Sequence, residues 1–161
     1  MDVHAVSEPS QLDLFLDETE INPADCVDLS EIDIDFGDGS TNAKMKSLNC
    51  ARLQALPKKK FLIYKGKEGE LPYIENTHTG KIVSINSGRT NYPCVKIHPH
   101  IYALHVLIGM AFIHNPLPKD RTQVDHIDGD KYNYAIENLR WVTPSENMLF
   151  VHSKKEIELD L

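Results

Sequence analysis

Residues 124–147 contain, in a compact order, the residue types that can hydrolyse a phosphodiester bond. Asp125 and His126 are adjacent, Asn138 follows a polar stretch, and Asn147 comes nine residues later. One carboxylate and one amide oxygen suit a hard divalent cation that keeps several water ligands. An imidazole with an unperturbed pKa of about 6.5 can take a proton from water at neutral pH. The pattern therefore predicts Mg²⁺ or Mn²⁺ held by Asp125 and Asn147, with His126 as the general base.

A short β-hairpin must position the first three of these residues. Residues 124–127 place apolar side chains on either side of Asp125 and His126, as in a short strand. Residues 138–143 (NLRWVT) supply an apolar partner strand, and the polar stretch DGDKYNYAIE between them contains turn residues.

A capped helix must position Asn147. The sequence Thr143-Pro144-Ser145-Glu146 has the form of a capping box, with Thr143 as the N-cap and proline at the first helical position. Glu146 would reach back to the start of the helix. Asn147 then falls in the first helical turn, facing the hairpin.

Each residue also has a structural interpretation when it is taken alone. An Asp-His pair in a strand is usually structural, and we assign Leu139 and Trp141 to the core. Arg140 alternates to the opposite face, where it either contacts phosphate or is solvated. The order of the four site residues, together with the capped helix, favours the catalytic interpretation.

This ordered motif resembles the HNH endonucleases, in particular the phage and intron-encoded, homing-endonuclease-like branch whose motif ends in asparagine. The resemblance implies an α+β fold with a ββα-metal nuclease core, and products with 5′-phosphate and 3′-hydroxyl ends. It also implies that Asn138 ties down the loop and orients His126. One active site per chain predicts nicking of double-stranded DNA. The arginine that commonly follows the helix histidine of this family is Val106 here, and we expect His105 to be structural.

The region before the motif is expected to be a small β-rich module. Residues 61–101 contain four short strand candidates (FLIY, PYI, KIVSI and CVKIH) and resemble the β module that precedes the motif in phage HNH enzymes. A helix over residues 41–56 would place Met45, Leu48 and Leu56 along one side, and a second helix is expected over residues 103–113. The candidate DNA contacts are Arg140, Lys131, Arg89, Lys96 and Arg121.

Charge divides the chain into two unlike parts. Residues 1–43 contain twelve acidic side chains and no Lys or Arg, whereas residues 44–161 contain seventeen basic and twelve acidic side chains, a net of +5. We therefore expect an acidic, mostly disordered arm over 1–43, followed by a basic folded part suited to DNA. The expected divisions are 44–101 for the first helix and β module, 102–155 for the nuclease unit and 156–161 for an acidic tail.

The arm contains a short candidate docking peptide. Its sequence QLDLF resembles the pentapeptide by which bacterial replication and repair proteins bind the sliding clamp, and it comprises Gln11, Leu12, Asp13, Leu14 and Phe15. Leu14 and Phe15 would fill an apolar pocket while Gln11 bonds at its edge. Alternatively, the segment packs on the nuclease core, or the acidic arm covers the basic face and suppresses cleavage.

The remaining composition narrows the class of protein. Cys26, Cys50 and Cys94 are isolated, so they predict neither a zinc site nor a disulfide framework, which is compatible with the cytoplasm. No apolar run approaches a membrane span, and the acidic N-terminus predicts no signal peptide. The alternative to an endonuclease is a non-catalytic DNA- and clamp-binding protein that modulates host replication.

Overall fold

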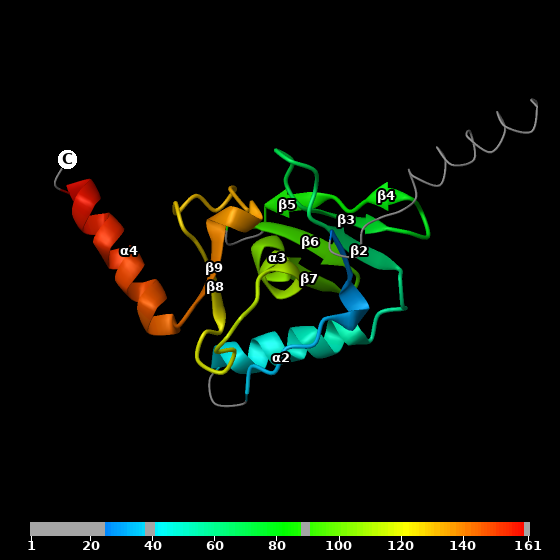
Figure 1. Cartoon of the computed structure of the whole chain (residues 1–161), viewed down its shortest axis with the longest axis horizontal. Coiled ribbons are helices and arrows are strands. Elements are labelled where there is room, and N and C mark those ends of the chain that lie inside the picture. Colours follow the sequence, from blue (N-terminus) through cyan, green and yellow to red (C-terminus); the bar gives the residue numbers. More distant parts are fainter. Residues whose placement is uncertain (1–24, 38–40, 88–90, 160–161) are drawn as a thin grey trace, which may run out of the picture.

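The computed structural model describes residues 25–37, 41–87 and 91–159 of the chain, and within them it has a mixed α+β fold (Figure 1). Three α-helices accompany several small antiparallel sheets, which confirms the expected fold class. None of the described helices is long and apolar enough to cross a membrane. The helices are α2 (Thr41–Gln54), α3 (Leu104–Phe112) and α4 (Pro144–Leu159), with short 3₁₀ helices η1 (Leu29–Glu31) and η2 (Ile136–Asn138).

The strands form three antiparallel sheets in chain order. The first has the order β1-β2-β3-β4, the second β5-β6-β7, and the third is the β8-β9 hairpin. Their bounds are β1 Cys26–Asp28, β2 Phe61–Tyr64, β3 Tyr73–Asn76, β4 Lys81–Ile82, β5 Ile85–Ser87, β6 Pro93–Ile97, β7 His100–Ala103, β8 Gln123–His126 and β9 Leu139–Val142.

Helix α3 lies at the centre of the molecule, between the β-rich module and the β8-β9 hairpin (Figure 1). Leu104, Leu107 and Ile108 are almost completely buried, so the helix is apolar on more than one side. Gly109 provides the close approach to the hairpin, because a Cβ at this position would lie 2.8 Å from Val124 Cγ2. The helix therefore connects the module to the strand that carries Asp125 and His126.

The folded part of the chain begins nearer the N-terminus than the sequence suggested. Residues 25–37 were expected within a mostly disordered arm, but β1 pairs with β2 and η1 follows it. Leu29, Ile32 and Phe36 are buried in the main core, and the ring of Phe36 packs 5.6 Å from that of Trp141. Apolar residues that alternate with the acidic ones make this possible, because the acidic side chains mostly stay exposed while the apolar ones are buried.

One acidic residue in this segment is itself buried. The carboxylate of Asp28 accepts hydrogen bonds from the backbone N–H of Ser30 at 2.9 Å and of Lys59 at 2.7 Å. Lys59 has a positive φ of 58°, so this bond fixes an unusual backbone conformation between α2 and β2. The segment is thus anchored by hydrogen bonds as well as by apolar packing.

Two local expectations for the module are corrected. The helix expected over 41–56 forms as α2, but it buries Ala43, Cys50 and Leu53, while Met45 and Leu48 are exposed. The expected strand KIVSI forms two short strands, β4 and β5, that belong to different sheets. Strand β7, which had not been expected, pairs with β6 before α3 begins.

Candidate functional site

The β8-β9 hairpin presents its polar residues on two different faces. Asp125 lies opposite Arg140 and His126 lies opposite Leu139 in the antiparallel register. Side chains alternate along a strand, so Gln123 and Asp125 share one face while Val124 and His126 share the other, buried face. Strand β8 ends at His126, and the expected strand residue Ile127 is exposed.

A capping box starts helix α4, as expected. The backbone N–H of Thr143 donates to Glu146 Oε2 at 2.8 Å, and the backbone N–H of Glu146 donates to Thr143 Oγ1 at 3.1 Å. This fixes the first turn of the helix beside the hairpin. There, Asn147 Nδ2 donates to Gln123 Oε1 at 2.7 Å. Asn147 therefore lies against the face of β8 that also carries Asp125.

Arg140 joins Asp125 to the same helix. Its guanidinium donates two hydrogen bonds to Asp125 Oδ2, from Nη2 at 3.0 Å and from Nε at 3.3 Å. The guanidinium also lies 4.0 Å from the ring centroid of Phe150, which is about one turn after Asn147 on α4. Asp125, Arg140 and Asn147 thus lie on the side of the hairpin where the first turns of α4 contact it.

The donor set on this face fits a hard cation that retains water ligands. The hydrogen bond to Gln123 uses the amide nitrogen of Asn147 and does not involve its amide oxygen. One carboxylate and one amide oxygen are only two protein ligands. Mg²⁺ is commonly bound by so few protein ligands, because it keeps several water ligands. No cluster of three His, Cys, Asp or Glu side chains that could hold a metal occurs in the described ranges. Binding at Oδ2 of Asp125 would require Arg140 to move away.

Asn138 closes the loop between the two strands. Its Nδ2 donates to Asp128 Oδ1 at 2.9 Å and to the Asn133 carbonyl at 2.8 Å, and its Oδ1 accepts the Asp128 backbone N–H at 3.1 Å. The backbone N–H of Ile127 donates to the Asn138 carbonyl at 2.8 Å. One side chain therefore links both ends and the middle of the loop.

Asp128 is a part of this network that we did not identify from the sequence. Its carboxylate accepts from Asn133 Nδ2 at 2.7 Å and from the backbone N–H of Asp130 at 2.8 Å. Hydrogen bonds from Asn133 and Asn138 lower the pKa of Asp128 to about 2. The available signal was the Asp-Gly-Asp turn, because an aspartate commonly bonds the backbone two residues ahead in such turns.

On the other face, His126 belongs to a cluster of rings. Its ring centroid lies 4.8 Å from that of His105 on α3 and 6.0 Å from that of Tyr92, and Tyr92 stacks on His105 at 5.1 Å. Lys131 Nζ lies 4.4 Å from the Tyr92 ring centroid. Only 5% of His126 is exposed. Burial, and secondarily the proximity of His126 and Lys46, lowers the pKa of His105 to about 3.

The candidate DNA contacts are in unlike environments. Arg140 is paired with Asp125, Arg121 lies 4.0 Å from Glu146, and Lys96 is exposed on β6. Lys131 lies over Tyr92, between the hairpin loop and the module. Arg89 and the QLDLF peptide at residues 11–15 lie outside the described residues.

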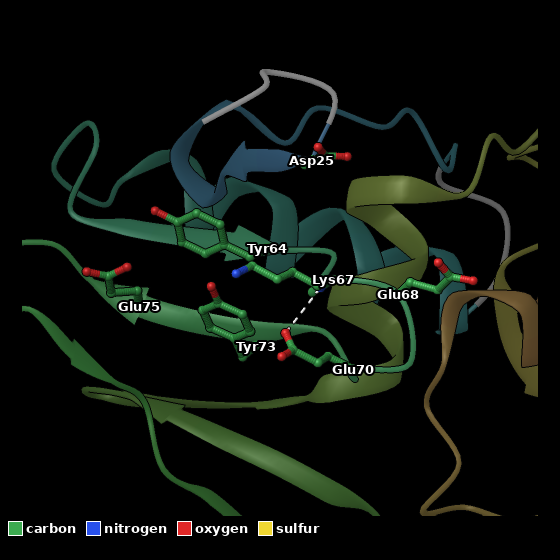
Figure 2. Close-up of a pocket in the computed structure, with 8 residues that line it drawn as sticks. Asp25, Tyr64, Lys67, Glu68, Glu70, Tyr73 and Glu75 are labelled. Atoms are coloured by element: carbon green, nitrogen blue, oxygen red, sulfur yellow. Dashed lines mark hydrogen bonds between the residues drawn. The ribbon is translucent and has the colours of Figure 1, made fainter. Parts of the chain in front are cut away.

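A cavity of about 690 Å³ lies away from this hairpin, on the first sheet (Figure 2). Tyr64 and Tyr73 stack there with their centroids 5.0 Å apart, and burial is the main reason that the pKa of Tyr64 rises to about 12. The other lining residues are mainly charged: Asp25, Lys67, Glu68, Glu70 and Glu75. None of the expected site residues lines this cavity.

Comparison with known proteins singles out the same part of the chain. Residues 102–149, which include the four expected site residues, match a family model described as HNH endonuclease. Two proteins of Acanthamoeba polyphaga mimivirus, each named as an uncharacterized HNH endonuclease, are similar in sequence. One is 38% identical over 80 residues, which are 47% of this chain and 20% of that protein. The other is 43% identical over 47 residues, which are 29% of this chain and 14% of that protein.

The chain therefore spans about a fifth or less of the length of these two relatives. No solved structure matches it.

Proposed function

We propose, on the premise that residues 102–149 form an HNH endonuclease domain, that this chain is a metal-dependent DNA endonuclease. One observation supports this most directly. The capped helix α4 packs Asn147 against Gln123, on the face of β8 that carries Asp125, while His126 is the next residue of the strand and faces the opposite, buried side. The three side chains assigned to cleavage thus come from two adjacent elements.

Asp125 and Asn147 are the proposed ligands of Mg²⁺ or Mn²⁺. A divalent cation held there would supply positive charge that stabilises the scissile phosphate and the leaving oxygen. Arg140 holds Asp125 through an ion pair, and its guanidinium would contact a phosphate if the cation took its place at Asp125. Arg140 would therefore be a partner of Asp125 without the cation and a DNA contact with it.

His126 is the proposed general base. In this role its imidazole takes a proton from water, and the hydroxide equivalent attacks phosphorus. Because 5% of His126 is exposed, neighbouring side chains must move when DNA binds so that the attacking water reaches the imidazole. Asn138 acts indirectly in this proposal, since its hydrogen bonds hold the loop that follows His126.

The products follow from attack by water on phosphorus with departure of the 3′ oxygen. This leaves a 5′-phosphate and a 3′-hydroxyl end. A single site per chain cuts one strand, so a double-strand break requires two chains or two successive events.

A supercoiled-plasmid assay with Mg²⁺ tests the proposal. We expect open circles with the wild type and a loss of most turnover with His126→Ala, while DNA binding is retained. The matched control is His78→Ala, which removes an exposed histidine in the turn between β3 and β4 and should leave nicking unchanged. Equal nicking by His126→Ala and the wild type would exclude His126 as the base.

The two ligand assignments have a separate test. Asp125→Ala and Asn147→Ala should each raise the Mg²⁺ concentration needed for half-maximal nicking. The Asp125 change should have the larger effect because it removes a charged oxygen ligand. An unchanged Mg²⁺ titration in both variants would count against this site.

We also propose that the chain is recruited to replicating DNA through the sliding clamp. This recruitment is supported by the QLDLF sequence, which precedes the first described strand by ten residues. A pull-down with the bacterial sliding clamp should retain the wild type and lose a Leu14→Ala/Phe15→Ala double variant. Equal retention of both proteins would end this proposal without affecting the nuclease assignment.

A further inference from the structure

We propose that His105 is a positioning residue whose ring fixes the orientation of the His126 imidazole for proton transfer. This inference rests on the proposed function, in which His126 is the general base. The sequence had suggested only a structural histidine at position 105. The structure instead places it in direct ring contact with His126.

The backbone of His126 is well held, and the rings packed around its side chain help to set the orientation of the imidazole. The residue ends β8, pairs with Leu139 across the hairpin, and its carbonyl accepts the Gly129 backbone N–H at 2.9 Å. These contacts fix the Cα–Cβ direction and leave the rotation of the imidazole to be set by its neighbours. The neighbouring rings are His105 at 4.8 Å and Tyr92 at 6.0 Å.

His105 is suited to this task because it stands on a rigid support. It lies in the first turn of α3, between the buried residues Leu104 and Val106. Tyr92 stacks on it at 5.1 Å with an interplanar angle of 29°, and the rings of Tyr92, His105 and His126 all contact one another. The His105 ring therefore packs against residues of both the module and the hairpin, and a displacement of α3 would be transmitted to His126.

The His105 ring packs against the rings of Tyr92 and His126. His105 Nδ1 is buried and has no hydrogen-bond partner among the described residues. Burial also keeps this imidazole neutral at physiological pH, because the pKa of His105 is about 3. A neutral neighbour does not repel the proton that His126 would accept during cleavage. A planar apolar ring should therefore be able to replace His105.

This leads to a test with three substitutions at one position. His105→Phe keeps a planar ring, His105→Leu keeps an apolar side chain without a ring, and His105→Ala removes most of the side chain. We expect kcat for plasmid nicking to fall by roughly 10- to 100-fold in the Ala and Leu variants, because small misplacements of a catalytic group have effects of this size. The KM for DNA should not change, and the Phe variant should retain most of the wild-type rate.

Loss of stability is separated from loss of positioning in two ways. Rates are compared per folded molecule, with the near-UV circular dichroism of buried Trp141 as the measure of folded protein. In addition, the ring carbon–proton NMR signal of His126 should shift in the Leu variant and stay close to its wild-type position in the Phe variant. A purely structural role would leave kcat per folded molecule unchanged in every folded variant.

The outcomes distinguish this inference from the proposed function. If His126→Ala is inactive while His105→Leu and His105→Phe nick equally fast, the positioning role is overturned and the nuclease assignment stands. If His126→Ala nicks like the wild type, the assignment of the base fails and this inference fails with it. If His105→Ala does not fold, the comparison of Leu with Phe gives the same decision.

Discussion

Gly109→Ala should destabilise the protein although alanine favours helices. The new Cβ would lie 2.8 Å from Val124 Cγ2 and 3.5 Å from Trp141 Cζ2. The first distance is shorter than side chains tolerate, and Val124 cannot easily rotate because a β-branched residue on a paired strand has few rotamers. Overpacking of this kind costs about 1–3 kcal/mol, and replacing glycine in a helix interior gains about 1 kcal/mol. Because the clash is close, we expect an overpacking cost in the upper half of that range, about 2–3 kcal/mol. After the gain from alanine is subtracted, the free energy of unfolding should fall by roughly 1–2 kcal/mol.

A double-mutant cycle with Val124→Ala tests this reasoning. Val124→Ala alone should destabilise the protein because it removes buried methyl groups. In that background the clash disappears, and Gly109→Ala should become neutral or stabilising by up to about 1 kcal/mol. Urea unfolding followed by the fluorescence of Trp141 measures each variant. If Gly109→Ala lowers stability equally in both backgrounds, the contact with Val124 is not the cause and the reasoning is refuted.

Three further predictions concern other parts of the fold. Thr143→Ala removes the acceptor for the Glu146 N–H and should reduce stability by about 0.5–2 kcal/mol in urea unfolding, whereas Thr143→Ser should be close to wild type. The pKa of His105 is about 3 when folded and 6.5 ordinarily, so the unfolded chain binds the extra proton between these values. Stability measured at several pH values should therefore fall as the pH drops from 6.5 towards 3, and His105→Phe should show a weaker fall. Removal of residues 1–24 should leave a cooperative thermal transition, whereas removal of residues 1–37 should abolish it, because burying Leu29 and Phe36 contributes about 1.5–3 kcal/mol each.

The hairpin and the helix that follows it were predictable because their signals are local. The capping box at residues 143–146 and the apolar spacing around Asp125 and His126 need no knowledge of distant residues. The ion pair between Asp125 and Arg140 was not predicted, although both residues were singled out. It depends on the strand register, which places these two residues opposite each other, and the ten-residue polar loop leaves that register open.

Features that depend on distant partners were missed. Val27 pairs with Ile63, and Phe36 packs on Trp141. The apolar residues of the acidic segment are buried by residues far along the chain, so their place in the core could not be predicted from the segment alone. The contact of His105 with His126 likewise joins a helix to a strand across a long loop. The sequence grouped Met45, Leu48 and Leu56 along one side of α2, whereas Ala43, Cys50 and Leu53 are the residues of this helix that face the core.

The packing of Phe36 on Trp141 also limits how the segment that matches the HNH family can be exchanged between genes. The segment that matches the HNH family begins at residue 102, yet its central tryptophan is covered by a side chain from far upstream. Recombination that moved residues 102–149 alone into another protein would leave this tryptophan without its cover. A new host protein would have to supply an apolar side chain at the same place. Inheritance of the segment at residues 102–149 is thus linked to residues 25–37 by packing that includes this ring contact, although those residues take no part in the proposed chemistry.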